Sequence, residues 1–373
     1  MFWNAGGTLE IFQPLIMKWI LCSFFTFLWI AANTQNLTDK FTQISHRVET
    51  FKESEHVPGV AIAITSHGEL IYAEGFGYAD LEQNSSVNPL TTRFRIGSIS
   101  KSLTASVLAK QLQQGLVDLD NPVQHYLPSY PSDGDKSMIT LRLLGGHLAG
   151  IRHYNGNEFL MNEHYTDVIP ALDIFKNDPL LHKPGSKYAY SSYGFNLISA
   201  VMQTVAGKPF LELMDDELIK PLGLLHTGPD MVSDIILDRT GYYVEDLQGN
   251  VVNAPAVDNS YKWAGGGFLS SATDLCRFAN ALLGEDFWTA DTRKLFITSQ
   301  KDDSNKETHY GIGFRSDTDN AGRHWFGHSG GSVGGTSNLV IYPEAELVIV
   351  VLTNKSNVRI GTLNQEIAAM ILD

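Results

Sequence analysis

The stretch Phe94-Arg-Ile-Gly-Ser98-Ile-Ser-Lys101-Ser-Leu-Thr-Ala105 opens a helical pattern and sets a serine three residues before a lysine. This spacing is close to one helical turn, so both side chains lie on one helix face. A serine hydroxyl needs a neighbouring base to become a good nucleophile, and a lysine can be that base once burial or nearby charge lowers its pKa. Backbone N–H groups at the helix start would also stabilise an oxyanion. We therefore predict Ser98 as nucleophile and Lys101 as its base; chance spacing is the alternative for this stretch alone.

A second candidate motif, Tyr188-Ala-Tyr190-Ser-Ser192-Tyr-Gly, is a polar turn that leads into another helical pattern. Tyr190 is expected to pass a proton to the leaving group. Ser192 is expected to hydrogen-bond Lys101 or a substrate. The alternative interpretation is a surface turn whose serines cap the next helix.

A third candidate motif is His324-Trp-Phe-Gly-His328-Ser-Gly330-Gly331, in which small residues follow a histidine on a strand. Small residues such as Gly330 leave room for a substrate beside the backbone. We expect His328 to donate to a substrate carbonyl or carboxylate. The N–H groups of Gly331 and Ser98 would then hold the oxyanion. Alone, this motif is equally typical of a loop histidine.

In this order, the three motifs resemble those of the serine beta-lactamase and penicillin-binding-protein superfamily: Ser-x-x-Lys, Tyr-x-Asn or Ser-x-Asn, and Lys-Thr-Gly. The chain is most similar to the class C beta-lactamase and esterase branch, and within it to the mitochondrial serine beta-lactamase-like proteins of animals. Two further segments resemble the family, His147-Leu-Ala-Gly-Ile151-Arg-His-Tyr154 and the segment from Ala264 to Asp274. The resemblance implies a beta-lactamase/transpeptidase-like α+β fold.

Two departures from the family pattern bear on the substrate. Ser192 stands where the family usually has Asn, which offers both a donor and an acceptor to a substrate amide. His328 stands where the family usually has a charged Lys, and with an ordinary pKa near 6.5 it is mostly neutral at pH 7. Hydrolysis of beta-lactams and of D-Ala-D-Ala peptides depends on that carboxylate contact, so ester or peptide hydrolysis stays open.

The resulting expectation is a serine hydrolase that forms a covalent acyl-enzyme on an ester, amide or beta-lactam bond of a small molecule or peptide. The alternatives are a D-alanyl-D-alanine carboxypeptidase or peptidase, and a non-catalytic binding or assembly protein of the same fold. We expect no cofactor. We also expect no metal, because the chain has no His-Glu-x-x-His and no cysteine cluster.

Apolar runs at the two chain ends predict the sheet. Residues 60–65 and 70–74 form one hairpin pattern, and residues 338–342 and 347–352 form another. The run 347–352 is apolar throughout, which indicates a central strand. Helical patterns cover residues 40–53, 100–115, 194–206, 210–220, 273–283 and 361–372. This order predicts an antiparallel sheet built from both chain ends and flanked by helices, with an inserted, mostly helical lobe.

The N-terminal segment predicts export. Residues 17–32 carry one lysine and then an apolar run of signal-peptide length, with a membrane anchor as the alternative. We expect a signal peptide over residues 1–35, with Met17 as a possible start, and one catalytic domain over residues 36–373 of a periplasmic or secreted protein. Membrane contact is expected only through an uncleaved N-terminal segment.

Charge and cysteine content limit the partners and cross-links. The net charge of -14 argues against nucleic acid as a partner. Of the two cysteines, Cys22 lies in the leader, so we expect Cys276 to be a buried thiol and the mature chain to have no internal disulfide. The sequence leaves the oligomeric state open.

Overall fold

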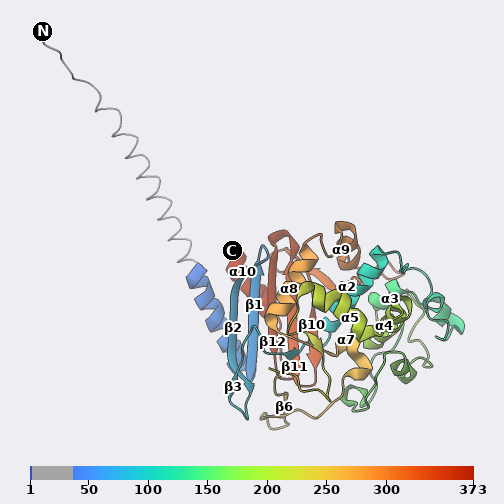
Figure 1. Cartoon of the computed structure of the whole chain (residues 1–373), viewed down its shortest axis with the longest axis horizontal. Helices are drawn as coiled ribbons and strands as arrows, with labels where there is room; N and C mark the ends of the chain where they lie inside the picture. The colour runs from blue at the N-terminus through green and yellow to red at the C-terminus, as the bar shows by residue number, and fades with distance from the viewer. Residues whose placement is uncertain (2–36) are drawn as a thin grey trace.

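The computed structural model describes Met1 and residues 37–373, and its centre is a seven-stranded antiparallel sheet (Figure 1). The strand order is β3-β2-β1-β12-β11-β10-β9. Strand β1, near the N-terminus, pairs with β12, near the C-terminus, so the prediction of a sheet built from both chain ends is confirmed. The strands are β1 (Gly59–Ser66), β2 (Glu69–Asp80), β3 (Ser85–Ser86), β9 (Arg315–Thr318), β10 (His324–Ser332), β11 (Gly335–Tyr342) and β12 (Leu347–Thr353).

Strand β12 is buried along its whole length, as its unbroken apolar run predicts. Alternate side chains point to opposite faces of a strand. Leu347, Ile349 and Val351 join an apolar cluster with the helix over residues 37–54 and with helix α10 (Leu363–Leu372). Their neighbours on the other face join the larger cluster beneath the helical lobe. Burying each such side chain contributes about 1.5–3 kcal/mol, which makes β12 the main packing element of the sheet.

The helical lobe is inserted between the strands of the two chain ends (Figure 1). Its helices, with those that flank the sheet, are α2 (Ile99–Gln113), α3 (Leu141–Gly145), α4 (Ser192–Ala206), α5 (Phe210–Met214), α6 (Lys220–Leu222), α7 (Trp263–Gly266), α8 (Ala272–Leu283) and α9 (Ala290–Ile297). A π-helical turn, Asp215–Ile219, joins α5 to α6, so the predicted helix over 210–220 is continuous but irregular. Helices α3, α7 and α9 are not predicted, because four to eight residues show too little periodicity.

Short elements complete the lobe. The strands β4 (Phe94–Arg95), β8 (Phe268–Ser270) and β5 (Gly228–Pro229) form one small sheet, and β6 (Tyr243–Glu245) and β7 (Val251–Asn253) form another. The 3-10 turns are Val123–His125, Gly134–Met138, Glu158–Leu160, Pro170–Ile174, Ser260–Lys262 and Pro343–Ala345. The β4–β8 pair holds together the chain segments that lead into α2 and out of α7.

Helix α2 is buried on nearly all sides, although it contains many hydroxyl side chains. These hydroxyls bond backbone carbonyls: Ser102 Oγ donates to Gly313 O at 2.8 Å, and Thr104 Oγ1 donates to Ala264 O at 3.0 Å. A buried hydroxyl without a partner would destabilise the fold. The satisfied hydroxyls therefore fix α2 against α7 and the loop before β9, and with it the position of the residues at its N-terminus.

Two further sequence predictions concern the N-terminal segment and Cys276. The predicted signal peptide over residues 1–35, with Cys22, lies outside the described residues. Within the described part of the chain, no helix is long and apolar enough to cross a membrane. Cys276 is a buried free thiol in α8, as predicted, and burial raises its pKa.

Candidate active site

Ser98 lies at the N-cap of α2, directly after a tight glycine turn. Gly97 has φ +49°, and a Cβ added there would lie 2.7 Å from the backbone N and O of Gly331. The start of α2 and strand β10 therefore touch through their backbones. Ser98 is partly exposed between buried neighbours, its hydroxyl makes no capping bond, and its backbone N–H donates to no described residue. The backbone N–H of Ser98 is thus available to a ligand.

Lys101 is fully buried one turn after Ser98. Its Nζ lies within hydrogen-bond distance of three oxygens: Ser98 Oγ at 3.1 Å, Ser192 Oγ at 2.9 Å and Gly265 O at 2.5 Å. A neutral amine can donate to only two of them, and its lone pair can then accept from the Ser98 hydroxyl. None of these partners carries a negative charge. Burial lowers the pKa of Lys101 well below its ordinary value, and the nearby charge of Lys262 lowers it further. A neutral amine in hydrogen-bond contact with a serine hydroxyl has the geometry of a general base.

Tyr190 and Ser192 stand at the start of α4, on the other side of Lys101. Lys101 Nζ lies 5.0 Å from the centroid of the Tyr190 ring. Burial raises the pKa of the Tyr190 phenol, and its hydrogen bond with Ser98 acts in the opposite direction. Tyr190 is therefore a neutral phenol near pH 7, able to donate a proton and to accept one through its lone pair.

Two histidines hold the backbone that carries these side chains. The N–H of Ser191 donates to His147 Nδ1 at 3.3 Å, and the N–H of Ser192 donates to His153 Nδ1 at 3.2 Å. Accepting at Nδ1 requires the ring to be neutral. Burial, followed by the charges of Lys101 and Lys262, lowers the pKa of His153 to about 4. Burial also lowers the pKa of His147.

His328 lies on β10 with its ring turned into the protein, 1% exposed. Its Nε2 is 2.7 Å from the Tyr310 hydroxyl, and its Nδ1 is 2.5 Å from Ser329 O. The carbonyl must accept, so Nδ1 carries the proton and Nε2 accepts from Tyr310. Burial lowers the pKa of His328 well below its ordinary value. The predicted contact between His328 and a substrate therefore requires the Tyr310 bond to open.

The two glycines after His328 face opposite ways. A Cβ on Gly330 would lie 2.0 Å from Ile96 O and 2.3 Å from Ser337 Oγ, so this position must be glycine for packing. A Cβ on Gly331 would meet nothing within 4 Å. Gly331 lines a hollow of about 270 Å³ together with Phe159. The open side of β10 is therefore at Gly331 rather than at Gly330.

The sequence did not indicate a functional role for four residues near the site. The charge of Lys262 acts on Lys101, the Tyr154 hydroxyl bonds Ser192, and Tyr310 bonds His328. Arg315, on β9, is exposed and makes no ion pair or side-chain hydrogen bond with any described residue, while its charge acts on Tyr190 and His328. Tyr154 closes a family-like segment, but no spacing rule connects Lys262, Tyr310 or Arg315 to the motifs.

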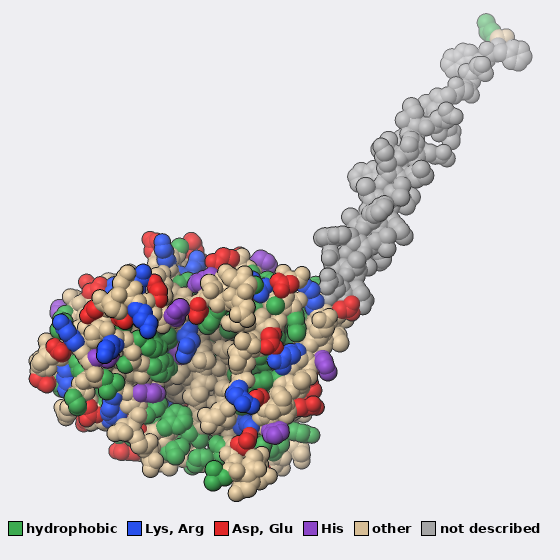
Figure 2. Space-filling view, turned by 180° about the vertical axis from the view of Figure 1, so that it is seen from behind, with side chains coloured by type: hydrophobic (Ala, Val, Ile, Leu, Met, Phe, Trp, Pro, Cys, Tyr) green, Lys and Arg blue, Asp and Glu red, His purple; other side chains and the backbone are tan. Residues whose placement is uncertain are grey.

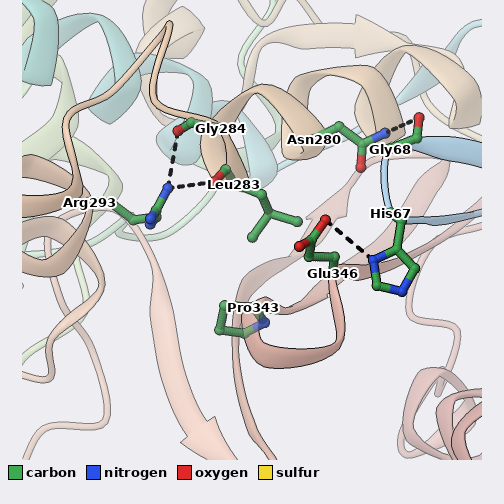
Figure 3. Close-up of a pocket in the computed structure, with 8 residues that line it drawn as sticks. All are labelled: His67, Gly68, Asn280, Leu283, Gly284, Arg293, Pro343 and Glu346. Atoms are coloured by element: carbon green, nitrogen blue, oxygen red, sulfur yellow. Dashed lines mark hydrogen bonds and ion pairs between the residues drawn. The ribbon is translucent and has the colours of Figure 1, made fainter.

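Other hollows and clusters do not compete with this site. The hollow in Figure 3 lies among the ends of α8, β1 and β11 and contains none of the predicted site residues. Arg293 in it is engaged by Leu282, Leu283 and Gly284 carbonyls at the end of α8. On the face in Figure 2, acidic and basic side chains are interspersed around a hollow with mainly uncharged walls. Across the described residues, no group of three or more His, Cys, Asp or Glu is placed to hold a metal ion.

Comparison with known proteins supports the same assignment of fold. The octameric penicillin-binding protein homologue from Pyrococcus abyssi superposes with a TM-score of 0.73 and 25% sequence identity, over 85% of this chain and 73% of that chain. A penicillin-binding protein from Bacillus halodurans gives a TM-score of 0.73 at 19% identity, over 87% of this chain and 98% of that chain. The predicted beta-lactamase/transpeptidase-like α+β fold is confirmed.

Similarity in sequence identifies the family as well as the fold. The family model described as Beta-lactamase matches residues 44–369. The human (Homo sapiens) serine beta-lactamase-like protein LACTB, mitochondrial, is 32% identical, over 83% of this chain and 72% of its own. The chain therefore belongs to the beta-lactamase family and is a serine hydrolase of that superfamily.

Proposed function

We propose that this serine hydrolase works through a covalent acyl-enzyme on Ser98. The observation that carries the proposal is Lys101: its amine is fully buried, has only neutral partners and lies 3.1 Å from Ser98 Oγ. A lysine in that setting loses its proton easily and can take the serine proton. No other described serine combines a buried lysine with an unbonded backbone N–H in this way.

The reaction follows from the positions of the groups. Ser98 Oγ attacks the substrate carbonyl carbon as its proton passes to Lys101, and the N–H groups of Ser98 and Gly331 hold the oxyanion. The proton then passes through the Tyr190 phenol to the leaving nitrogen or oxygen, and the scissile bond breaks. Water, deprotonated by the same pair, attacks the acyl ester and releases the acid with Ser98 restored. Ser192 holds Lys101 in line throughout.

The proposed substrate is an ester, amide or beta-lactam that carries a carboxylate. The sequence predicts that His328 donates to a substrate carbonyl or carboxylate, but its buried, neutral ring is poorly suited to bind a carboxylate. Arg315 is better suited, because its exposed guanidinium has no ion-pair partner among the described residues and its charge acts on Tyr190. Guanidinium groups bind carboxylates in a bidentate manner.

Arg315 also supports a second candidate, a peptidase of the D-alanyl-D-alanine carboxypeptidase type, since a free peptide C-terminus supplies that carboxylate. The Pyrococcus abyssi neighbour, called a penicillin-binding protein homologue, is consistent with it. The two candidates share one mechanism and differ only in the bond that is broken.

Turnover by the purified protein tests the proposal. We would measure hydrolysis of a chromogenic acyl ester, a D-aminoacyl amide and a penicillin by the wild type, Ser98→Ala and Lys101→Met. Both variants should lose on the order of 10³-fold or more in kcat/KM on whichever substrate is turned over. Ser137→Ala, an exposed serine on the 3-10 turn Gly134–Met138, is the matched control and should behave as the wild type. Undiminished turnover by folded Ser98→Ala would refute the mechanism.

A further inference from the structure

The site contains a second buried lysine, which the mechanism above leaves unused. Lys262 ends the 3-10 turn Ser260–Lys262 and directly precedes α7, and it is 2% exposed. The same helix provides Gly265 O, which accepts a hydrogen bond from Lys101. Lys262 Cδ lies 3.9 Å from the position of a Cβ on Gly266, and that position is 3.8 Å from the carbonyl carbon of Gly97. The Lys262 side chain therefore runs behind the turn that presents Ser98.

The surroundings of the Lys262 ammonium are aromatic rather than acidic. Its Nζ lies 4.2 Å from the ring centroid of Phe159 and 5.2 Å from those of Tyr154 and Tyr261. It makes no hydrogen bond or ion pair with any described residue.

Asp230 is the carboxylate whose charge acts on Lys262, and other groups already bind it. Asp230 Oδ2 accepts from Arg95 Nε at 2.7 Å and from Asn259 Nδ2 at 3.0 Å. Its charge is thereby shared with Arg95, which itself repels Lys262. The aromatic cage thus holds a cation whose charge no partner neutralises.

This arrangement has an electrostatic consequence for the neighbouring base. Aromatic faces stabilise an ammonium through their quadrupole but leave its net charge in place. A carboxylate partner would cancel that charge at short range. We propose that Lys262 is a positioning residue whose aromatic-caged, uncompensated ammonium keeps Lys101 in the neutral form that can deprotonate Ser98. The inference rests on the proposed acyl-enzyme mechanism and adds the group that tunes its base.

The pKa shifts of the two lysines have the directions that this role requires. The charge of Lys262 lowers the pKa of Lys101, and burial with the charge of Arg95 lowers the pKa of Lys262 itself to about 7. Lys262 is therefore charged on the acid side of pH 7, where its repulsion opposes protonation of Lys101. The other titratable groups around Lys101 are Tyr190, His147, His153 and His328, and burial disfavours the charged form of each. Lys262 is thus the cation that biases Lys101.

The pH dependence of Ser98 phosphonylation, which needs the same deprotonation of Ser98 as acylation does, tests this role. We would measure the labelling rate with a fluorophosphonate from pH 5 to 10 for the wild type, Lys262→Met and Lys262→Arg. In Lys262→Met, the acidic limb of the pH–rate profile, where protonation of Lys101 lowers the rate, should move to higher pH by about one unit, because the variant removes the buried cation whose charge lowers the pKa of Lys101. The rate should recover at high pH. Lys262→Arg keeps the positive charge, so its labelling rate should fall at about the same pH as that of the wild type.

A second variant covers the case in which Lys262→Met does not fold. Phe159→Leu removes the nearest ring of the cage at a half-buried position, and should move the limb in the same direction by less. The variants could instead lower the labelling rate by the same factor at every pH, without changing the pH at which the rate falls. Lys262 would then be only structural, and the inference is overturned. A wild type that fails to label at all contradicts the proposed function instead.

Discussion

At the residue scale, the reactivity of Ser98 depends on how Lys101 is surrounded. Burial alone favours the neutral amine, and the three hydrogen bonds of its Nζ go to two hydroxyls and one carbonyl. A carboxylate among these partners would favour the ammonium and remove the base. Ser192 in place of the family's Asn preserves a neutral partner at 2.9 Å. The departure at Ser192 is therefore compatible with an active lysine.

Arg315 is the residue whose substitution should separate substrates. Arg315→Gln removes the guanidinium and should lower kcat/KM by about 10- to 100-fold on a substrate with a carboxylate, as expected for loss of one charge-assisted pair. A neutral ester should be hydrolysed at the wild-type rate. Steady-state kinetics on a matched acid and methyl-ester pair would measure this, with exposed Arg277→Gln as the control. Equal losses on both substrates would exclude Arg315 as the carboxylate anchor.

At the element scale, the turn before α4 is held by the segment that follows α3. His147 and His153 each accept one backbone N–H from this turn, at Ser191 and Ser192. Arg152, between them, also fixes the segment through its ion pairs with Glu158 and Asp178. Because both imidazoles must be neutral to accept, protonation of either ring would break a hydrogen bond that holds the turn of Tyr190.

Acid should therefore destabilise the protein through these histidines. The pKa of His153 is about 4 in the folded chain and about 6.5 when unfolded, so unfolding takes up a proton between these values. The free energy of unfolding should fall as pH drops from about 6.5 towards 4. In His153→Asn, Oδ1 can still accept from Ser192 N, and the proton uptake at pH 5 should decrease by about one. Urea denaturation at several pH values measures this.

The control for that experiment is His125→Asn, an exposed histidine on the turn Val123–His125. It should leave the pH dependence of stability unchanged. A profile for His153→Asn that overlays the wild-type profile would show that His153 is not held neutral by the fold.

At the scale of the whole molecule, the site lies where the inserted lobe meets the sheet. Strand β10 contributes Gly331 and His328, while α2, α4 and α7 of the lobe contribute the remaining groups. Strand β12 pairs with β1 on one side and with β11 on the other, and β11 pairs with β10, so the sheet that places β10 opposite α2 contains strands from both chain ends. The chemistry thus depends on pairing between the two ends of the chain.

The sequence predicted the parts of this architecture that depend on local pattern. The unbroken apolar run of strand β12 and the amphipathic patterns of the long helices α4 and α8 can each be recognised within a single segment. Helix α7 has four residues and no periodicity, so it was missed.

The sequence likewise predicted those residues of the site that lie in local motifs. Ser98, Lys101 and Ser192 lie in recognisable motifs, and the structure brings them into hydrogen-bond contact. The roles proposed for Lys262 and Arg315 depend on residues that the fold brings near them, such as Phe159 and Tyr154 around Lys262, and no local pattern encodes these neighbours. The burial of the His328 ring is accompanied by its bond with Tyr310, which no motif of the sequence indicates.

The most direct test of the proposed mechanism is whether Ser98 is the nucleophile that forms a covalent adduct. Intact-mass spectrometry of the purified protein after incubation with a fluorophosphonate, followed by peptide mapping, would measure this. If Ser98 is the nucleophile and Lys101 is its base, the wild type gains a single adduct on Ser98. The same adduct forms slowly in Lys101→Met and is absent from Ser98→Ala. A folded wild-type protein that gains no adduct, or an adduct that maps to another residue and persists in Ser98→Ala, would contradict it.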